Sequence, residues 1–258
     1  MKTRQEIKAL SKKAVASQRK TAILLELVFL PVVIVLVLVV ALIQLALGGG
    51  DTIIALVVSN IIFLIGLLVL SVVYVNAYGE HVKVYRQEQA SVAAIFTGLK
   101  VNFWRKLGGL LWMELWVMLW TLLLIIPGII KSLAYSMTIF LLADHPKVKA
   151  RQALKISMRM TNGHKGQIFI FYLSFLGWLL LPLLPAIIFS SINTAIAGTG
   201  FGIWAILTLL TFLAAIVFYI AFVYPYLYTA SAGLYHELRE KALAEGKVTH
   251  EELGMPAP

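Results

Sequence analysis

One stretch of the sequence decides the class of fold. Residues 166–235 read GQIFIFYLSFLGWLLLPLLPAIIFSSINTAIAGTGFGIWAILTLLTFLAAIVFYIAFVYPYLYTASAGLY, and none of them is Asp, Glu, Lys or Arg. In an ordinary soluble domain about a quarter of the residues are charged. An uncharged stretch of this length has no place in a soluble fold, so the lipid bilayer is the expected solvent of the chain.

The composition of the whole chain agrees with this interpretation. Of its 258 residues, 60% are apolar and 13% are charged. These values exclude an ordinary soluble enzyme and a disordered tail. The chain has no cysteine, which excludes disulfide scaffolds, thiolate zinc sites, iron–sulfur clusters and cysteine nucleophiles.

Runs of about 18 or more apolar residues predict helices that cross the bilayer. Working outward from the uncharged stretch, we predict six spans, at residues 21–47, 52–78, 107–126, 129–143, 167–189 and 203–225. Turn-forming residues separate the first span from the second, at 48–51, and the third from the fourth, at Pro127 and Gly128. The spans should therefore pair as three helical hairpins.

The fourth predicted span is short. Residues 129–143 would rise only about 22 Å as a helix, whereas the hydrocarbon core is about 30 Å thick. The third and fourth segments are therefore either two short spans or a re-entrant hairpin, and both options return the chain to the same side. The prediction is an all-α, polytopic helical membrane protein, with one domain at residues 1–240 and a tail at 241–258.

The basic residues predict the orientation. Segments 1–20, 79–106 and 144–166, together with residues 236–258, contain 21 of the 22 lysine and arginine residues. The loops at 48–51 and 190–202 contain none, and Lys131 is the exception. Because short basic loops stay on the cytoplasmic side, we expect both termini to be cytoplasmic.

Amphipathic helices are expected on that side of the membrane. Thr3 and Glu6 form a capping-box pattern at the start of the first. The apolar spacing of residues 92–99 predicts a second, and residues 150–159 a third with a basic face. The candidate contacts to anionic headgroups are Arg105, Lys106, Lys147, Arg151, Lys155 and Arg159. Alternatively, these helices only satisfy the charge rule; no nucleic-acid-binding fold is apparent.

Polar residues inside the spans form the second set of candidates, because burying them in lipid is costly. They are Glu26, Glu114, Asn60, Asn76 and Lys131. Glu26 and Glu114 lie at similar depths and could face each other and share a proton, or they could pair with nearby cations or reach the interface. The asparagines are expected to bond between helices, and Lys131 to extend to the headgroups.

Motifs of catalysis and cofactor binding are missing from the sequence. No Walker loop, G-x-G-x-x-G, H-E-x-x-H or G-x-S-x-G pattern occurs, and the five histidines lack metal-ligand spacing. We therefore expect no cofactor, no metal and no enzymatic activity.

Several short motifs resemble a known family. In order along the chain they are Pro127-Gly128-Ile129, Asp144-His145-Pro146, Ala153-Leu154-Lys155-Ile156-Ser157, Asn162-Gly163 and Ser174-Phe175-Leu176-Gly177. The pattern resembles the uncharacterised bacterial integral membrane proteins of domain-of-unknown-function family 975. More distantly, it is similar to the membrane domain of glycerophosphodiester phosphodiesterases. The resemblance implies a six-helix protein of the bacterial inner (cytoplasmic) membrane and brings no activity with it.

These observations favour a non-enzymatic membrane protein that acts in bacterial envelope or lipid homeostasis through lipid or partner binding. A transporter or exporter of a small solute or peptide is the alternative, suggested by Glu26, Glu114, Lys131 and the Pro-interrupted hairpins. A membrane-embedded lipid enzyme is the third hypothesis. The sequence leaves the ligand, any protein partner and the oligomeric state open.

Overall fold

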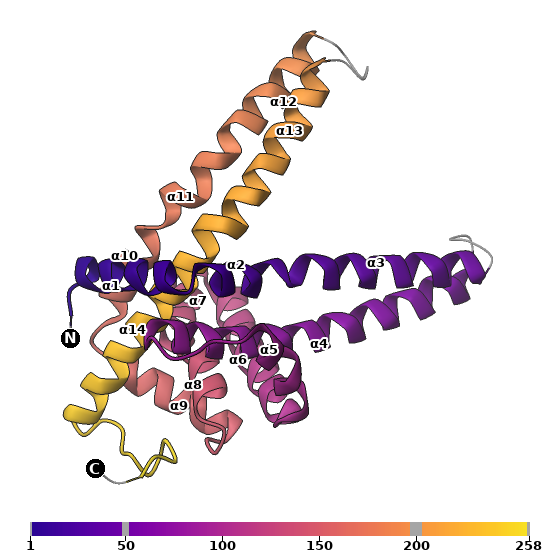
Figure 1. Cartoon of the computed structure of the whole chain (residues 1–258). Helices are drawn as coiled ribbons and strands as arrows, with labels where there is room; N and C mark the ends of the chain where they lie inside the picture. Colours follow the sequence, from indigo (N-terminus) through magenta and orange to yellow (C-terminus); the bar gives the residue numbers. More distant parts are fainter. Residues whose placement is uncertain (1, 48–51, 197–202, 257–258) are drawn as a thin grey trace.

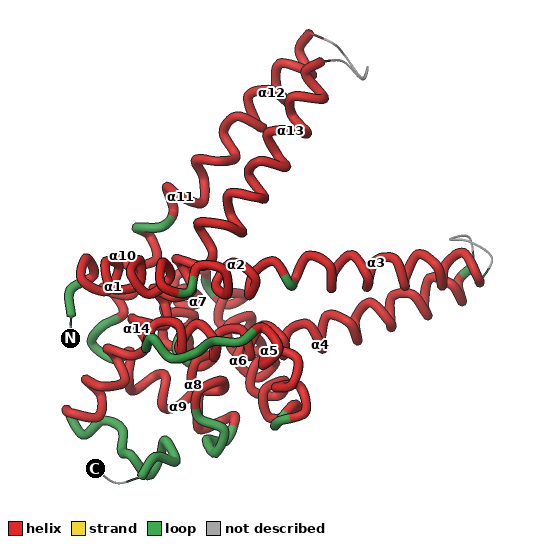
Figure 2. Tube along the Cα trace, viewed as in Figure 1, coloured by secondary structure: helices red, strands yellow, loops and turns green. Residues whose placement is uncertain are grey.

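The computed structural model describes residues 2–47, 52–196 and 203–256. Within these ranges every regular element is a helix, so the all-α prediction is confirmed (Figure 2). Six of the described helical segments are long and apolar enough to cross a membrane, which supports a multi-pass membrane protein. The predicted turn at 48–51, and residues 197–202 of the predicted loop at 190–202, lie outside the described residues.

The first half of the chain forms the helices α1 (Arg4–Ser17), α2 (Arg19–Leu27), α3 (Phe29–Ala46), α4 (Ile53–Tyr85), α5 (Val92–Thr97), η1 (Gly98–Lys100), α6 (Phe103–Leu123) and α7 (Ile125–Tyr135). The second half forms α8 (Thr138–Asp144), α9 (Ala150–Thr161), α10 (Lys165–Leu173), α11 (Leu176–Leu180), η2 (Leu181–Leu183), α12 (Leu184–Ile196), α13 (Ile203–Phe218), the π-helix η3 (Tyr219–Val223) and α14 (Tyr224–Ala244).

Two pairs of helices, α3–α4 and α12–α13, extend from a common base (Figure 1). The base consists of α1, α2, the buried end of α4, α5, α8, α9, α14 and residues 245–256. The α3–α4 and α12–α13 pairs point in clearly different directions (Figure 1), and α6 packs along α7. No residue of α3 is buried, although nearly all its side chains are apolar. Such surfaces suit lipid rather than water.

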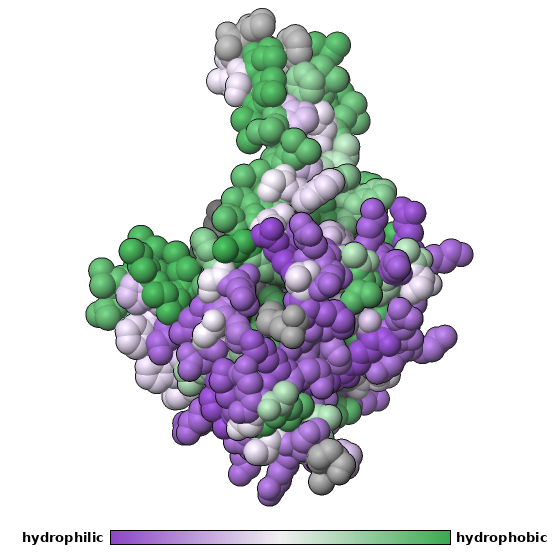
Figure 3. All heavy atoms as spheres, turned by 90° about the vertical axis from the view of Figure 1, so that its left-hand side faces the viewer, coloured by the Kyte–Doolittle hydropathy of each residue, from purple (hydrophilic) through white to green (hydrophobic). Residues whose placement is uncertain are grey.

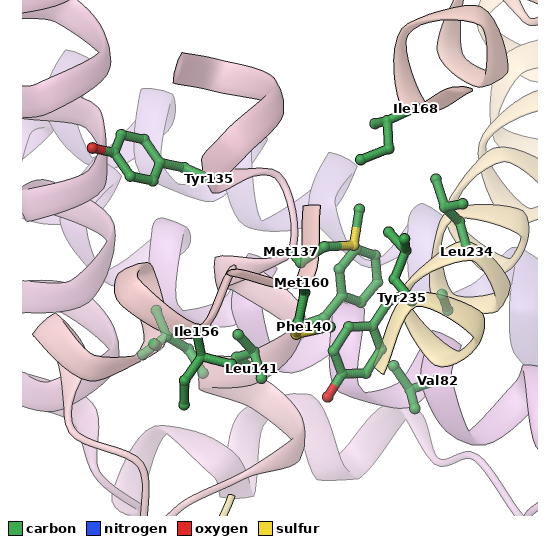
Figure 4. Packing of buried hydrophobic residues seen from close by; sticks show 14 of the residues in the cluster. Val82, Tyr135, Met137, Phe140, Leu141, Ile156, Met160, Ile168, Leu234 and Tyr235 are labelled. Atoms are coloured by element: carbon green, nitrogen blue, oxygen red, sulfur yellow. The ribbon is translucent and has the colours of Figure 1, made fainter. Parts of the chain in front are cut away.

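The apolar core lies in the base. Phe140 of α8 stacks on Tyr235 of α14 with ring centroids 5.2 Å apart. Met137 just before α8, Ile156 of α9 and Ile168 of α10 belong to the same cluster (Figure 4). Burial of such side chains contributes about 1.5–3 kcal/mol each. The core therefore joins the second half of the chain to the end of α4.

The segment predicted as a separate tail, 241–258, contributes to this core. The last helix continues to Ala244, and Val248 and Leu253 beyond it are 2% and 1% exposed. The packing therefore shows no boundary at residue 240.

The break in the second predicted hairpin, between the third and fourth spans, lies before Pro127, not at Pro127 and Gly128 as predicted. Helix α6 ends at Leu123, Leu124 is extended, and α7 begins at Ile125. Proline is tolerated in the first turn of a helix, where its missing N–H has no intrahelical partner. The described fourth segment, Ile125–Asp144, is accordingly longer than the predicted 129–143, and α8 inside it belongs to the base.

The first and last spans also differ from their predicted bounds. A break at Val28 divides the first helical segment, Arg19–Ala46, just before Pro31. The last segment continues well past the predicted end at residue 225, and the π-helix Tyr219–Val223 precedes Pro225. In both places a proline removes one backbone donor and the helix is irregular beside it.

The polarity of the surface differs between the base and the extending helices. Hydrophilic side chains gather over the base, whereas hydrophobic ones cover the extending helices (Figure 3). All four basic segments of the sequence contribute helices or loops to the base. The structure therefore has a polar part and lipid-facing extensions.

Candidate functional site

Asp144 is the centre of a charge cluster in the base. It ends α8, where α4 and α14 meet that helix. Arg86, just after α4, donates from Nη1 to Oδ1 (2.9 Å) and from Nη2 to Oδ2 (2.6 Å). From α14, Arg239 Nη1 and the Tyr235 hydroxyl each donate to Oδ2 at 3.0 Å. One carboxylate thus joins three elements that are far apart in the sequence.

The cluster is balanced in charge and has an uncharged histidine beside it. Arg239 Nη2 also donates to Glu240 Oε1 at 2.7 Å, so two carboxylates match two guanidinium groups. His145 Nε2 lies 3.4 Å from Asp144 Oδ2. Burial lowers the pKa of His145; Asp144 opposes this effect, whereas Arg239 and Arg86 add to it. The cluster thus joins α4, α8 and α14.

A second polar group lies between α2, α4 and α14. His81 Nε2 is 2.8 Å from Glu26 Oε1, and His81 Nδ1 is 3.1 Å from Thr229 Oγ1. All three residues are buried, and His81 is only 1% exposed. The sequence left open whether Glu26 faces Glu114, pairs with a nearby cation or reaches the interface; in the structure its partner is His81.

The remaining intramembrane candidates do not meet at one site. Glu114 is exposed on α6, and among the described residues no hydrogen bond or ion pair involves it. Asn60 is exposed and donates to Leu56 O of its own helix (2.8 Å), not between helices as expected. Lys131 Nζ lies 4.9 Å from the centre of the Trp120 ring. The grouping that suggested a transport site is therefore absent from the described structure.

Lys106 and Asn76 form a buried contact. Lys106 was predicted to contact lipid headgroups, but it is 7% exposed and donates from Nζ to Asn76 Oδ1 (2.6 Å) and Gly98 O (3.2 Å). Asn76 in turn donates from Nδ2 to Ile95 O (2.7 Å). These residues fix α5 and η1 against α4 and α6, so Lys106 is unavailable to lipid.

Arg105 likewise binds protein rather than lipid. It donates from Nη2 to Leu142 O (2.5 Å) and from Nη1 to Val148 O (2.7 Å). The carbonyl groups at a helix C-terminus lack intrahelical partners, and Arg105 satisfies one at the end of α8. The structure thus gives Arg105 protein acceptors, and its predicted headgroup contact stays a prediction.

The predicted basic helix α9 packs into the base by its apolar face. Ala153, Leu154, Ile156 and Met160 are buried. Arg159 donates to Glu252 Oε1 at 2.8 Å, and this hydrogen bond lowers the pKa of Glu252. Three of the six predicted headgroup contacts remain exposed: Lys147, Arg151 and Lys155.

A pocket of about 570 Å³ lies between α1, α10 and α14. This volume is typical of small-molecule sites. Its polar lining consists of Lys2, Thr3, Arg4, Gln5, Gln167 and Lys241, and its apolar lining of Ile7, Ile170, Phe171 and Leu234. The pocket therefore combines cationic side chains with an apolar floor.

The cations of this pocket differ in how far they are already neutralised. Lys2 Nζ donates to Glu237 Oε1 at 2.7 Å, and this hydrogen bond raises the pKa of Lys2. Lys241 Nζ lies 3.6 Å from Glu245 Oε1. Among the contacts of the described residues, Arg4 has no acidic partner. Arg4 is thus the cation most available to an anionic ligand.

Helix α1 forms one side of the pocket. Contacts at the start of this helix and one turn later hold it in place. Thr3 and Glu6 form the capping box predicted from the sequence. One turn after Arg4, Lys8 donates from Nζ to Ser174 Oγ (2.6 Å) and lies 3.9 Å from the centre of the Phe175 ring. The N-terminal helix is therefore fixed alongside α10, beside the apolar residues of that helix.

The sequence interpretation missed the pocket because its lining comes from three distant segments. It also missed the roles of Arg86, His81, Arg239 and Thr229. Asp144 was noticed only as part of the Asp144-His145-Pro146 motif. The sequence showed only that Asp144 is a charged residue at the end of an apolar helix, and this does not identify its partners.

Comparisons with known proteins give one match. A family model described as "protein of unknown function (DUF975)" matches residues 121–242. The match supports the resemblance predicted from the motifs at 127–177, and it covers α7 to most of α14. No curated protein matches the chain, and no solved structure matches it.

Proposed function

We propose that this chain, a helical membrane protein whose residues 121–242 match the DUF975 family, is a non-enzymatic lipid-binding protein. Its ligand is an anionic lipid, and its site is the pocket between α1, α10 and α14. The single observation that carries the proposal is the lining of that pocket, with Arg4 and Lys241 above an apolar floor.

The chemistry of an anionic lipid fits both parts of this lining. A phosphate headgroup accepts hydrogen bonds from guanidinium and ammonium groups, and each cation near an anionic membrane surface contributes about 1 kcal/mol. Ile170 lines the pocket and is 50% exposed, and Phe169 and Leu173 beside it on α10 are also exposed. These side chains offer an acyl chain an apolar path along α10.

The position of the pocket supports the same ligand. It lies where α10, the first part of the fifth candidate span, leaves the polar base. With both termini on the cytoplasmic side of a bacterial inner membrane, the orientation that the basic residues favour, the pocket faces the inner leaflet. A role in envelope or lipid homeostasis follows from such a site.

Native mass spectrometry of the protein released from its own membrane tests the proposal. We expect a retained anionic lipid with the unaltered protein and its loss with Arg4→Gln combined with Lys241→Gln. The matched control is Lys12→Gln with Lys13→Gln, which removes two exposed cations from the same region outside the pocket lining. Equal lipid retention by all three proteins would contradict the proposal.

A further inference from the structure

Beyond lipid binding, the structure contains a buried acid–base group with no role in the pocket. Glu26, His81 and Thr229 form a hydrogen-bonded row, with 2.8 Å between Glu26 Oε1 and His81 Nε2 and 3.1 Å between His81 Nδ1 and Thr229 Oγ1. Because an ionised carboxylate only accepts hydrogen bonds, Nε2 must donate to Glu26. Nδ1 is then free to accept from Thr229 or, when protonated, to donate to it.

The surroundings of this row contain hydroxyl groups, and among the described residues no lysine or arginine forms an ion pair with it. From α4, the Tyr74 hydroxyl lies 2.9 Å from that of Tyr78, and from α14 the Tyr228 hydroxyl lies 3.2 Å from that of Tyr74. The Tyr228 ring centre is 5.6 Å from that of His81, and Tyr224 of α14 is close enough to interact electrostatically with Glu26.

The other elements that pack against the three helices of the row are α1, α3, α5, α6, α8, α9, η1 and η3. Among the described residues, none of their charged side chains lies within ion-pair distance of Glu26, whose partner is His81. Within the described part of the chain, His81 is thus the one ion-pair partner of Glu26, and opposite charges in a poorly screened site interact strongly.

The row lies at a joint between two helix pairs. Glu26 is two residues before the break at Val28 that separates α2 from α3, and His81 is on α4. Thr229 is in the second turn of α14, and the π-helix Tyr219–Val223, which packs against α2, precedes that helix. The α3–α4 and α12–α13 pairs diverge from this region (Figure 1). Short π-helical turns occur often at functional sites.

We propose that Glu26, His81 and Thr229 form a proton-binding site that controls the angle between the α3–α4 and α12–α13 pairs. A proton from solvent binds His81 Nδ1, which then donates to Thr229 Oγ1, and the imidazolium forms an ion pair with the Glu26 carboxylate. Loss of that proton leaves a buried negative charge without a cation. The protonated state therefore fixes the joint, and the deprotonated state loosens it.

The absence of cysteine from the sequence makes a direct test possible. Leu42→Cys on α3 and Leu209→Cys on α13, both at exposed positions, are spin-labelled in the full chain in phosphatidylcholine nanodiscs. Their separation is measured by double electron–electron resonance from about pH 5 to about pH 8, the interval in which histidines commonly change charge. The absence of anionic lipid keeps this test independent of the pocket.

We expect a narrow distribution of distances at the acidic end and a broader, shifted one at the basic end. Glu26→Gln and His81→Gln should each abolish this dependence on pH, whereas His164→Gln, which removes a histidine remote from the row, should preserve it. Identical distributions at all pH values for the unaltered residues would overturn the proposal, and so would a dependence that survives both site substitutions.

A variant that keeps both titrating groups covers the case in which those two substitutions prevent folding. Thr229→Val removes only the hydroxyl that accepts the proton of Nδ1. We expect the midpoint of the change to move to lower pH, because the imidazolium loses an acceptor in a buried site. An unchanged midpoint in the folded Thr229→Val protein would also overturn the proposal.

Discussion

The α3–α4 pair and the base both consist of helices, but they differ in how many of their side chains are buried. In α3 no residue is buried, and large apolar side chains such as Val35 and Leu42 are more than half exposed. In the base, Asp144, Arg239, His81 and Glu26 are buried or nearly so and have partners from distant segments. Helix α3 therefore has an apolar surface and no buried residue, whereas the base, which includes the end of α4, contains many specific contacts.

We expect the largest loss of stability from a substitution at Asp144, which would disrupt the base. Asp144→Asn leaves Arg86 and Arg239 without their shared carboxylate, and removing one partner of a buried ion pair costs about 3–5 kcal/mol. Unfolding by rising sodium dodecyl sulfate in dodecyl maltoside micelles measures the change in free energy. Glu251→Gln, at an exposed position, is the control, and a loss as small as in the control would contradict the role of Asp144.

The core of the base should be far more sensitive to truncation than the surface of the α3–α4 pair. Leu141 is 0% exposed and Leu38 is 56% exposed. Leu141→Ala should therefore destabilise by about 2–5 kcal/mol, and Leu38→Ala by less than about 0.5 kcal/mol, in the same unfolding assay. Equal effects would show that the two regions do not differ in packing as described.

Loss of the Arg105 contacts should have a smaller effect. Arg105→Gln removes charged hydrogen bonds to Leu142 O and Val148 O, and such bonds contribute about 1.5–3 kcal/mol each. Because glutamine can replace one of them, we expect a destabilisation of about 2 kcal/mol. The control is Lys155→Gln, which removes an exposed cation and should leave the stability almost unchanged in this assay. If Arg105 instead contacted a headgroup, Arg105→Gln would be as stable as this control and would retain less lipid.

The smallest expected effect is the acid sensitivity caused by His145. Since burial lowers the pKa of this histidine in the folded protein, the unfolded chain binds its proton first as the pH falls. The stability contributed by neutral His145 is thus fully present above the unfolded value of about 6.5 and decreases below it. His145→Gln should flatten the stability profile below about pH 6.5, and an unchanged slope there would contradict this assignment.

The sequence was sufficient to predict the helical class, the six candidate spans and the capping box of α1. Hydropathy and local spacing determine these features, and both are visible in neighbouring residues. The break before Pro127 and the length of the last helix were predicted wrongly, because prolines near a helix start or beside a π-turn need not end a helix.

The sites required contacts that no local pattern shows. Arg105 and Lys106 have the aromatic–basic sequence of an interfacial anchor, yet both side chains turn inward to protein acceptors. The charge rule gives the side on which such residues lie, but it does not give their direction. The pocket depends on the packing of Arg4 and Ile7 against Phe171 and Leu234, which are far apart in the sequence.

Site-specific photocrosslinking tests the lipid site most directly. A photoreactive amino acid replaces Gln167, which lines the pocket, or Lys155, which is exposed on the basic face of α9. In membranes that contain labelled phosphatidylglycerol, we predict a lipid adduct at position 167 that disappears with Arg4→Gln and Lys241→Gln, and a much weaker adduct at 155. An adduct at 155 alone, or an adduct at 167 that is insensitive to those two substitutions, would contradict the proposed site.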